Sequence, residues 1–169
     1  TLGEYIRQNI RYSLESRNLS PRSGASASIV AEKGETVLSE ISTALNIDTT
    51  DNQRLPTEGY VFSIASAFAG LGGDKEFIRI NNNGNYYHAF NDEVIILNLE
   101  YNAGVIMGIG QDILISDRYF LGGNSFRGFD QSGIGPRDKN NSDSLGGNIF
   151  YTSSIKTSFG VGLPPELGI

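Results

Sequence analysis

The sequence contains no cysteine and no tryptophan, and it has one methionine and one histidine. Without cysteine the chain has no disulfide framework, no thiolate metal site and no thiol nucleophile. A histidine-based metal cluster or a catalytic triad would depend entirely on His88, and no acid or nucleophile lies at a suggestive spacing from it. We interpret His88 as a histidine with satisfied hydrogen bonds or one that faces a watery interior. The sequence predicts no enzyme, no cofactor and no metal site.

Basic residues and long apolar runs are also scarce. The 13 Lys and Arg against 19 Asp and Glu give a net charge of -6, and this field repels nucleic acid. A general nucleic-acid binder is therefore excluded.

The densest apolar stretch, residues 94–113, is interrupted by Asn98, Glu100, Asn102 and glycines. It therefore falls short of the uninterrupted apolar run of about 20 residues that a membrane helix needs. The chain opens at Thr1 without a Met, a basic leader or an apolar segment, and residues 163–169 resemble a turn before a strand. We expect a longer parent chain.

The positive signal in the sequence is alternation of apolar and polar residues with a period of two, which is typical of strands with two different faces. Six segments show this alternation, although segment 77–90 has an asparagine-rich centre, and asparagine has a low strand propensity. The predicted strands are residues 5–15, 41–50, 60–69, 77–90, 95–109 and 149–161.

The connections between these strands differ in length. Turns at 53–59 and 91–93 are short, whereas those at 19–36 and 117–147 are long, and a short helix is expected within 25–38. An antiparallel meander places the long connections at one end of the sheet and the short turns at the other. Transmembrane β-barrels have this asymmetry, with long extracellular loops and short periplasmic turns. The fold prediction is all-β: an antiparallel up-and-down meander of six strands, forming an incomplete segment of a transmembrane β-barrel, with residues 1–169 as one partial barrel domain.

A soluble β-sandwich is the alternative, because it also has strands with one buried and one solvated face. Strands of ten residues or more favour the barrel, since this is about the length that crosses a bilayer at a tilt. A barrel with a watery lumen also accommodates charges in mid-strand. We expect a concave polar face that includes Arg7, Asn46, Asn98, Glu100 and Lys156. The convex apolar face should include Ile6, Tyr12, Ile47, Phe62, Leu97, Tyr101, Tyr151 and Phe159.

The long segment 117–147 combines glycines with aromatic and charged residues, which is unusual for a disordered loop. We expect it to fold back onto something. Within it Arg127 lies between Phe126 and Phe129. Its planar guanidinium is suited to pair with a carboxylate while the two rings cover its faces.

Four blocks in this segment carry a family resemblance. They are Arg118-Tyr119-Phe120-Leu121-Gly122-Gly123-Asn124, Phe126-Arg127-Gly128-Phe129, Ile134-Gly135-Pro136-Arg137-Asp138 and Leu145-Gly146-Gly147-Asn148. In this order they resemble the sixth extracellular loop and following strand of the BamA family, the barrel subunits of the outer-membrane protein assembly machinery, within the bacterial surface antigen superfamily. Residues 51–59 and 68–74 resemble the family more weakly, and the tail resembles alphaproteobacterial members. Phe126 departs from the family's usual Val, Leu or Ile but stays apolar.

The resemblance implies that the chain covers about six consecutive strands from the middle of a barrel of roughly sixteen, without the gate strands and the periplasmic POTRA domains. It implies a loop tucked into the lumen, where the motif Phe126 to Phe129 braces the barrel and Arg127 pairs with an acidic residue beyond Ile169. The supporting loop residues are Arg118, Tyr119, Phe120, Gly122, Gly123, Ile134, Gly135, Pro136, Arg137 and Asp138.

The implied function is folding and insertion of β-barrel proteins in the outer membrane of Gram-negative bacteria. The implied partners are unfolded outer-membrane proteins, the lipoproteins of the assembly complex and the lipid bilayer. Alternatives are a translocation and assembly module subunit, a two-partner secretion transporter, a soluble β-sandwich binding module, and an enzyme with a lipase domain upstream of the barrel.

Overall fold

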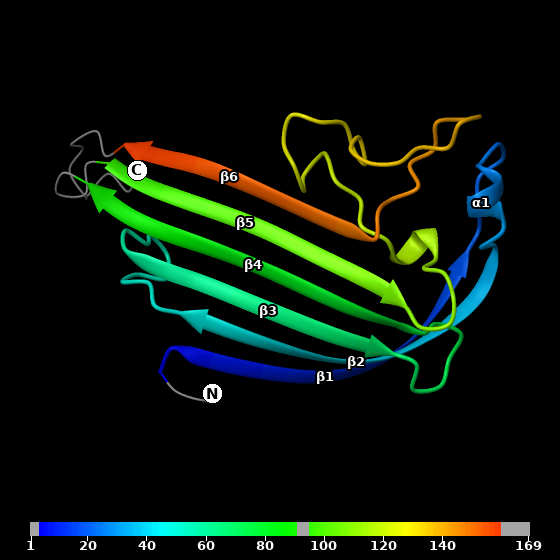
Figure 1. Ribbon diagram of the computed structural model, residues 1–169, viewed down its shortest axis with the longest axis horizontal. Helices are drawn as coiled ribbons and strands as arrows, with labels where there is room; N and C mark the ends of the chain where they lie inside the picture. The colour runs from blue at the N-terminus through cyan, green and yellow to red at the C-terminus, as the bar shows by residue number, and fades with distance from the viewer. Residues whose placement is uncertain (1–3, 91–94, 160–169) are drawn as a thin grey trace.

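The computed structural model describes residues 4–90 and 95–159, which form one six-stranded antiparallel sheet whose strand order follows the sequence (Figure 1). The elements are β1 (Ile6–Leu19), α1 (Ala27–Val30), β2 (Gly34–Asp48), β3 (Gly59–Ala69), β4 (Phe77–Phe90), β5 (Ile95–Gly108), the 3-10 turn η1 (Ile115–Asp117) and β6 (Ile149–Phe159). The predicted open meander is confirmed. The β-sandwich alternative is wrong, because all six strands belong to a single sheet. None of the helices in the described residues has the length and apolarity needed to cross a membrane.

Some predicted boundaries need correction. The first connection occupies residues 20–33 instead of 19–36, because β1 continues to Leu19 and β2 already begins at Gly34. The helix expected within 25–38 is reduced to the four residues of α1. A helix this short has little stability of its own, whereas Glu35 and Thr36 gain ladder partners in Asn18 and Arg17 of β1.

The other connections also shift. Residues 49–58 join β2 to β3, and residues 109–148 join β5 to β6. The predicted turn at 91–93, the end of the last predicted strand and the tail at 160–169 lie outside the described residues.

The strand register separates the two faces of the sheet. Residues directly opposite each other in an antiparallel ladder point to the same side. One row of partners crosses the sheet as Arg7, Asn46, Ser63, Asn83, Asn102 and Thr152, and the adjacent row crosses as Ile6, Ile47, Phe62, Gly84, Tyr101 and Ser153. Asn98 lies opposite Lys156, and Glu100 lies opposite Ser154. The predicted division into a polar and an apolar face is confirmed.

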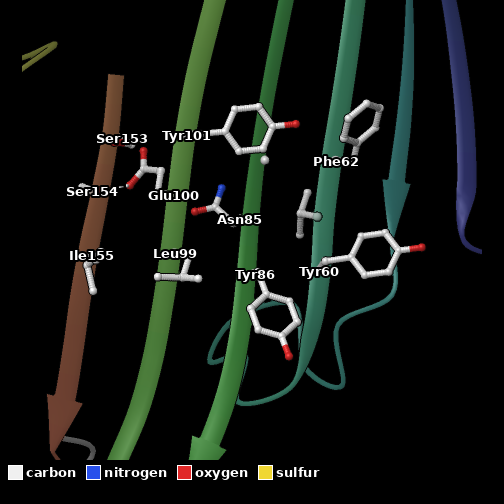
Figure 2. Close-up of a pocket in the computed structure, with 12 residues that line it drawn as sticks. Tyr60, Phe62, Asn85, Tyr86, Leu99, Glu100, Tyr101, Ser153, Ser154 and Ile155 are labelled. Atoms are coloured by element: carbon white, nitrogen blue, oxygen red, sulfur yellow. Dashed lines mark hydrogen bonds between the residues drawn. The ribbon is translucent and has the colours of Figure 1, made fainter. Parts of the chain in front are cut away.

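The apolar face is exposed over most of its area. Tyr151 and Ile155 of β6 are 84% and 74% exposed, and Tyr12 of β1 is 58% exposed. Between β3 and β6 this face has a shallow apolar hollow (Figure 2), lined by residues that include Tyr60, Tyr86, Leu99 and Ile155. A contiguous apolar surface of this kind is expected where strands face lipid.

The polar face is the concave one at the end that carries the long connections. Arg17 of β1 forms an ion pair with Asp117 of the β5–β6 connection, across the strands that lie between β1 and β6. A small buried core fills this concave end, formed by Leu38, Ala69, Phe77, Ile106 and Ile113. The sheet therefore curls around its polar face, and the core beneath the loops is where side chains from several strands converge.

Candidate functional site

The β5–β6 connection, residues 109–148, folds back over the polar face (Figure 1). Tyr119 and Gly147 exchange both backbone hydrogen bonds at 2.9 Å, and further bridges join Leu121 to Ile134 and Arg137 to Ser144. We call residues 113–121 and 143–148 the stalk and residues 122–135 the lobe. The connection is thus a two-legged hairpin with a folded tip.

Arg118 joins the two legs of the stalk. Its Nε and Nη2 donate to the carbonyl oxygen of Ile113 at 3.1 and 3.0 Å, and its Nη1 donates to the carbonyl oxygen of Leu145 at 3.3 Å. The planar guanidinium supplies several donors in a fixed arrangement. This residue, predicted as loop support, therefore holds the legs of the stalk together.

Tyr119 attaches the stalk to the sheet. Its hydroxyl donates to Oδ1 of Asn81 on β4 at 2.6 Å, and its ring lies 4.6 Å from the ring of Phe150 between centroids. Gly104 of β5 leaves room for the ring, because a Cβ there would lie 2.9 Å from Cζ of Tyr119. Burial raises the pKa of Tyr119, so the hydroxyl remains a donor.

The lobe carries the Phe126–Phe129 motif. Gly123 N–H donates to the Phe129 carbonyl oxygen at 2.9 Å, and Gly122 adopts a φ of +124° next to the carbonyl oxygen of Asp130. The rings of Phe126 and Phe129 lie 5.6 Å apart and contact each other. Arg127 forms no ion pair within residues 4–90 and 95–159.

A polar groove separates the lobe from the sheet. Phe126 and Arg127 line one wall, and Glu100, Ser154 and Lys156 line the other, around a volume of about 670 Å³. Lys156 forms an ion pair with Glu100, which also accepts from the Ser154 hydroxyl at 3.4 Å. The groove therefore presents charges of both signs on the concave side of the sheet.

The remaining predicted support residues lie in the stalk, in the lobe and in the segment 136–142 that follows the lobe. Ile134 N–H donates to the Leu121 carbonyl oxygen at 3.1 Å, and Leu145 N–H donates to the Pro136 carbonyl oxygen at 2.9 Å. Arg137 Nη1 donates to the Ser142 carbonyl oxygen at 2.9 Å, and Oδ1 of Asp138 accepts the N–H groups of Asn140 and Asn141. Gly135 has a φ of +118°, and Phe120 lies beside Gly146. The structure brings all these residues into one folded loop.

Residues 141–143 contact the β1–β2 connection. Asp143 accepts from Nη2 of Arg22 and from the backbone N–H of Ser26, both at 2.8 Å, and Asn141 Nδ2 donates to the Gly24 carbonyl oxygen at 3.0 Å. The Ser26 N–H and then the Arg22 guanidinium lower the pKa of Asp143. The two long connections thus meet above the polar face.

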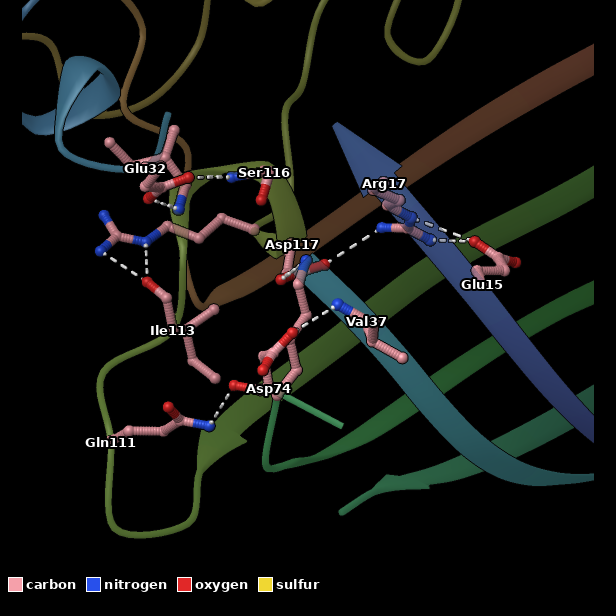
Figure 3. Close-up of polar contacts among 12 residues, drawn as sticks. Glu15, Arg17, Glu32, Val37, Asp74, Gln111, Ile113, Ser116 and Asp117 are labelled. Carbon is pink, nitrogen blue, oxygen red and sulfur yellow. Dashed lines mark hydrogen bonds and ion pairs between the residues drawn. The ribbon is translucent and has the colours of Figure 1, made fainter. Parts of the chain in front are cut away.

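A buried ionic cluster at the base of the stalk was not predicted. Oδ2 of Asp117 accepts from Nζ of Lys75 at 2.7 Å, with the two side chains 2% and 3% exposed. Arg17 Nη1 lies 3.2 Å from Oδ1 of Asp117 (Figure 3). Arg79 Nη2 donates to the Asp117 carbonyl oxygen at 3.1 Å. Alternation gives no signal for this cluster, because Lys75 and Asp117 lie in connections. The sequence offered one indication of this contact: the connections that contain Lys75 and Asp117 lie at the same end of an antiparallel meander.

His88 is a satisfied side chain on the apolar face. Its Nδ1 lies 3.2 Å from Glu58, its ring contacts Phe90, and it pairs with Leu97 in the register. It does not face the polar groove.

Comparisons with known proteins identify the family of the chain. The model of the Omp85 superfamily domain matches residues 2–166. The outer membrane protein assembly factor BamA of Neorickettsia risticii is 34% identical over 171 residues, covering 100% of this chain and 23% of that protein. The human sorting and assembly machinery component 50 homolog is 30% identical over 137 residues, covering 78% of this chain and 28% of that protein.

A solved structure has a similar fold. The crystal structure of BamA from Haemophilus ducreyi lacking POTRA domains 1–3 superposes with a TM-score of 0.66 at 19% identity, covering 75% of this chain and 26% of that chain. The chain thus spans about a quarter of the length of the relatives it matches. The resemblance inferred from the loop motifs is confirmed. The chain belongs to the Omp85 superfamily.

Proposed function

We propose that the chain is the central part of the barrel of a bacterial outer-membrane assembly factor, which folds and inserts β-barrel proteins into the outer membrane. Within it the Phe126–Phe129 motif braces the lumen from the polar face. The similarity to BamA over the whole chain supports this assignment. The loop adds a structural argument of its own.

The observation that supports the proposal most directly is the placement of the loop. Tyr119 bonds to Asn81 on the polar face, and the lobe with Arg127 lies across a groove from Glu100 and Lys156. A loop held over the concave face of a curved sheet occupies the lumen of the closed barrel. It therefore supports the barrel wall from within, at the height of the middle of the strands.

The physical task needs no covalent chemistry. An incoming strand has backbone N–H and C=O groups that are costly to leave unpaired inside lipid. An exposed strand edge supplies hydrogen-bonding partners for them. The loop's part is to maintain the shape of the barrel while an edge is open. The substrates are then unfolded outer-membrane proteins, and the further partners are assembly-complex lipoproteins and the bilayer.

The experiment is Arg127→Ala in the protein at its full natural length. We expect the yield of folded porins to fall about tenfold, because a charge-assisted contact of the guanidinium is worth about 1.5–3 kcal/mol. Arg127→Lys should rescue poorly, since lysine keeps the charge but loses the planar fork. Arg54→Ala is the matched control, because Arg54 lies in the exposed β2–β3 turn at the other end of the sheet. Unchanged porin yield in Arg127→Ala would contradict the role of the motif, and loss of export with normal porin yield would indicate a secretion transporter.

A further inference from the structure

The lobe is attached to the sheet through the stalk. Within the described residues, every hydrogen bond of residues 122–135 stays between residues 121 and 144. Examples are the Gly123–Phe129 backbone bond inside the lobe and the bond from the Ser144 hydroxyl to the Ser132 carbonyl oxygen. The position of Arg127 over the groove is therefore set by whatever fixes the stalk.

The first leg of the stalk contains the turn η1, and this turn is held by groups from four other parts of the fold; Figure 3 shows two of these groups, Arg17 and Glu32. Arg17 comes from β1, Lys75 from the β3–β4 connection and Arg79 from β4, and all three bond to Asp117. Glu32, in the β1–β2 connection, accepts the backbone N–H groups of Ile115 and Ser116. The turn is thus fixed relative to both halves of the sheet.

Among these contacts the Lys75–Asp117 pair is the buried one, since both side chains are at most 3% exposed. A buried ion pair does not add much net stability, because desolvation offsets the attraction. It does impose a geometry, since displacing either partner leaves an uncompensated charge in a poorly solvated site. Arg79 reinforces the arrangement, with its guanidinium carbon 4.9 Å from the centroid of the Phe77 ring.

We propose that the Lys75–Asp117 pair is the positioning contact that sets where the Phe126–Phe129 lobe lies over the sheet. Asp117 acts through the stalk and does not itself touch the motif. This inference rests on the proposed function only in its expected effect on the assembly of outer-membrane proteins. The placement of the lobe is a separate quantity that is measured without any substrate.

The test uses spin labels in the protein at its full natural length, reconstituted into lipid vesicles. The chain has no cysteine of its own, so labels are introduced at Asn124→Cys in the lobe and Asn9→Cys on the polar face of β1. We expect Asp117→Asn to broaden the distance distribution and shift its mean. Asp51→Asn is the matched control, because it makes the same change in the turn at the far end of the sheet. An unaltered distribution in Asp117→Asn would overturn the proposal.

A second variant covers the case in which Asp117→Asn fails to fold. Lys75→Met combined with Asp117→Leu removes both charges and keeps apolar bulk, which is expected to restore folding. It does not restore the ion pair, so the lobe distribution should remain displaced. A wild-type distribution in this double variant would equally overturn the proposal.

Hydrogen exchange in the unaltered protein provides a test without substitutions. The amides of Ile115 and Ser116 should exchange more slowly than the lobe amide of Arg127, and equal exchange would contradict a fixed turn. The assembly assay then separates the two proposals. A displaced lobe with normal porin yield supports the positioning contact and refutes the proposed role of the motif. A displaced lobe with reduced porin yield supports both.

Discussion

The hydroxyl of Tyr119 in the stalk donates a hydrogen bond to Oδ1 of Asn81 on β4 at 2.6 Å. This contact joins a residue of the long loop to the asparagine-rich centre of the strand that was hardest to predict. Asn81 and Asn83 lie on the polar face by register, opposite Gly104 and Asn102. The asparagines that weaken the strand propensity of β4 thus supply the acceptor to which the loop is attached.

The first prediction concerns this bond. Tyr119→Phe should lower the free energy of unfolding by about 1–2 kcal/mol, because it removes the donor and leaves the partly buried Asn81 oxygen without it. Urea titration of the reconstituted protein measures the change. Tyr151→Phe is the control, because Tyr151 is 84% exposed on the apolar face. An equal change in the free energy of unfolding for both substitutions would show that the Tyr119–Asn81 hydrogen bond does not stabilise the protein.

The second prediction concerns the sharp reversal at Gly122. An alanine at this φ of +124° is strained, and its Cβ would overlap the carbonyl oxygen of Asp130. We expect Gly122→Ala to make the lobe more sensitive to protease by displacing residues 122–130. Gly135→Ala is the matched control, since Gly135 has a φ of +118° but no atom within 4 Å of a built Cβ. It should carry only the backbone strain of about 1–3 kcal/mol. Equal protease sensitivity of the Gly122→Ala and Gly135→Ala variants would show that the overlap with Asp130 does not displace the lobe.

The third prediction concerns the apolar face. Tyr101 of β5 lies over Gly84 of β4, and a Cβ on Gly84 would overlap the Tyr101 ring. Gly84→Ala should therefore destabilise by about 1–3 kcal/mol, as overpacking does. In a Tyr101→Ala background the same substitution should have a much smaller effect. A double-mutant cycle of unfolding free energies measures this coupling, and additive effects would contradict the contact.

The fourth prediction concerns acid stability at the β2–β3 turn. Asp51 accepts from the backbone N–H of Glu58 and from the hydroxyl and N–H of Thr57, and these bonds lower its pKa from 3.8 to about 2. A lowered pKa means that the stabilisation is complete above pH 3.8 and disappears as the pH falls through about 2. The difference in unfolding free energy between wild type and Asp51→Asn should therefore shrink over this range. A difference that stays constant to pH 2 would refute it, and Thr57→Val should reduce the effect by removing one donor.

The alternation of apolar and polar residues predicted the features that follow from local sequence, namely which residues form strands and which face of the sheet each side chain occupies. It placed Glu100 and Lys156 on one face and Tyr101 on the other, as the register shows. It missed the first residues of β2, because Glu35 and Thr36 become strand only through pairing with β1. It also missed Lys75 with Asp117, since a contact between two connections depends on how the sheet curls. The loop motifs located the stalk and lobe but not what holds them.

The contact of Asp143 with Arg22 and Ser26 has a consequence for the order of folding. Each strand of the meander pairs with its neighbour in sequence, so the sheet can grow hairpin by hairpin through local contacts. The Arg22–Asp143 contact joins residues 121 positions apart, in the connections that follow β1 and precede β6. We therefore expect the two long connections to form their contacts in a late, separate phase of folding, after the strands have paired.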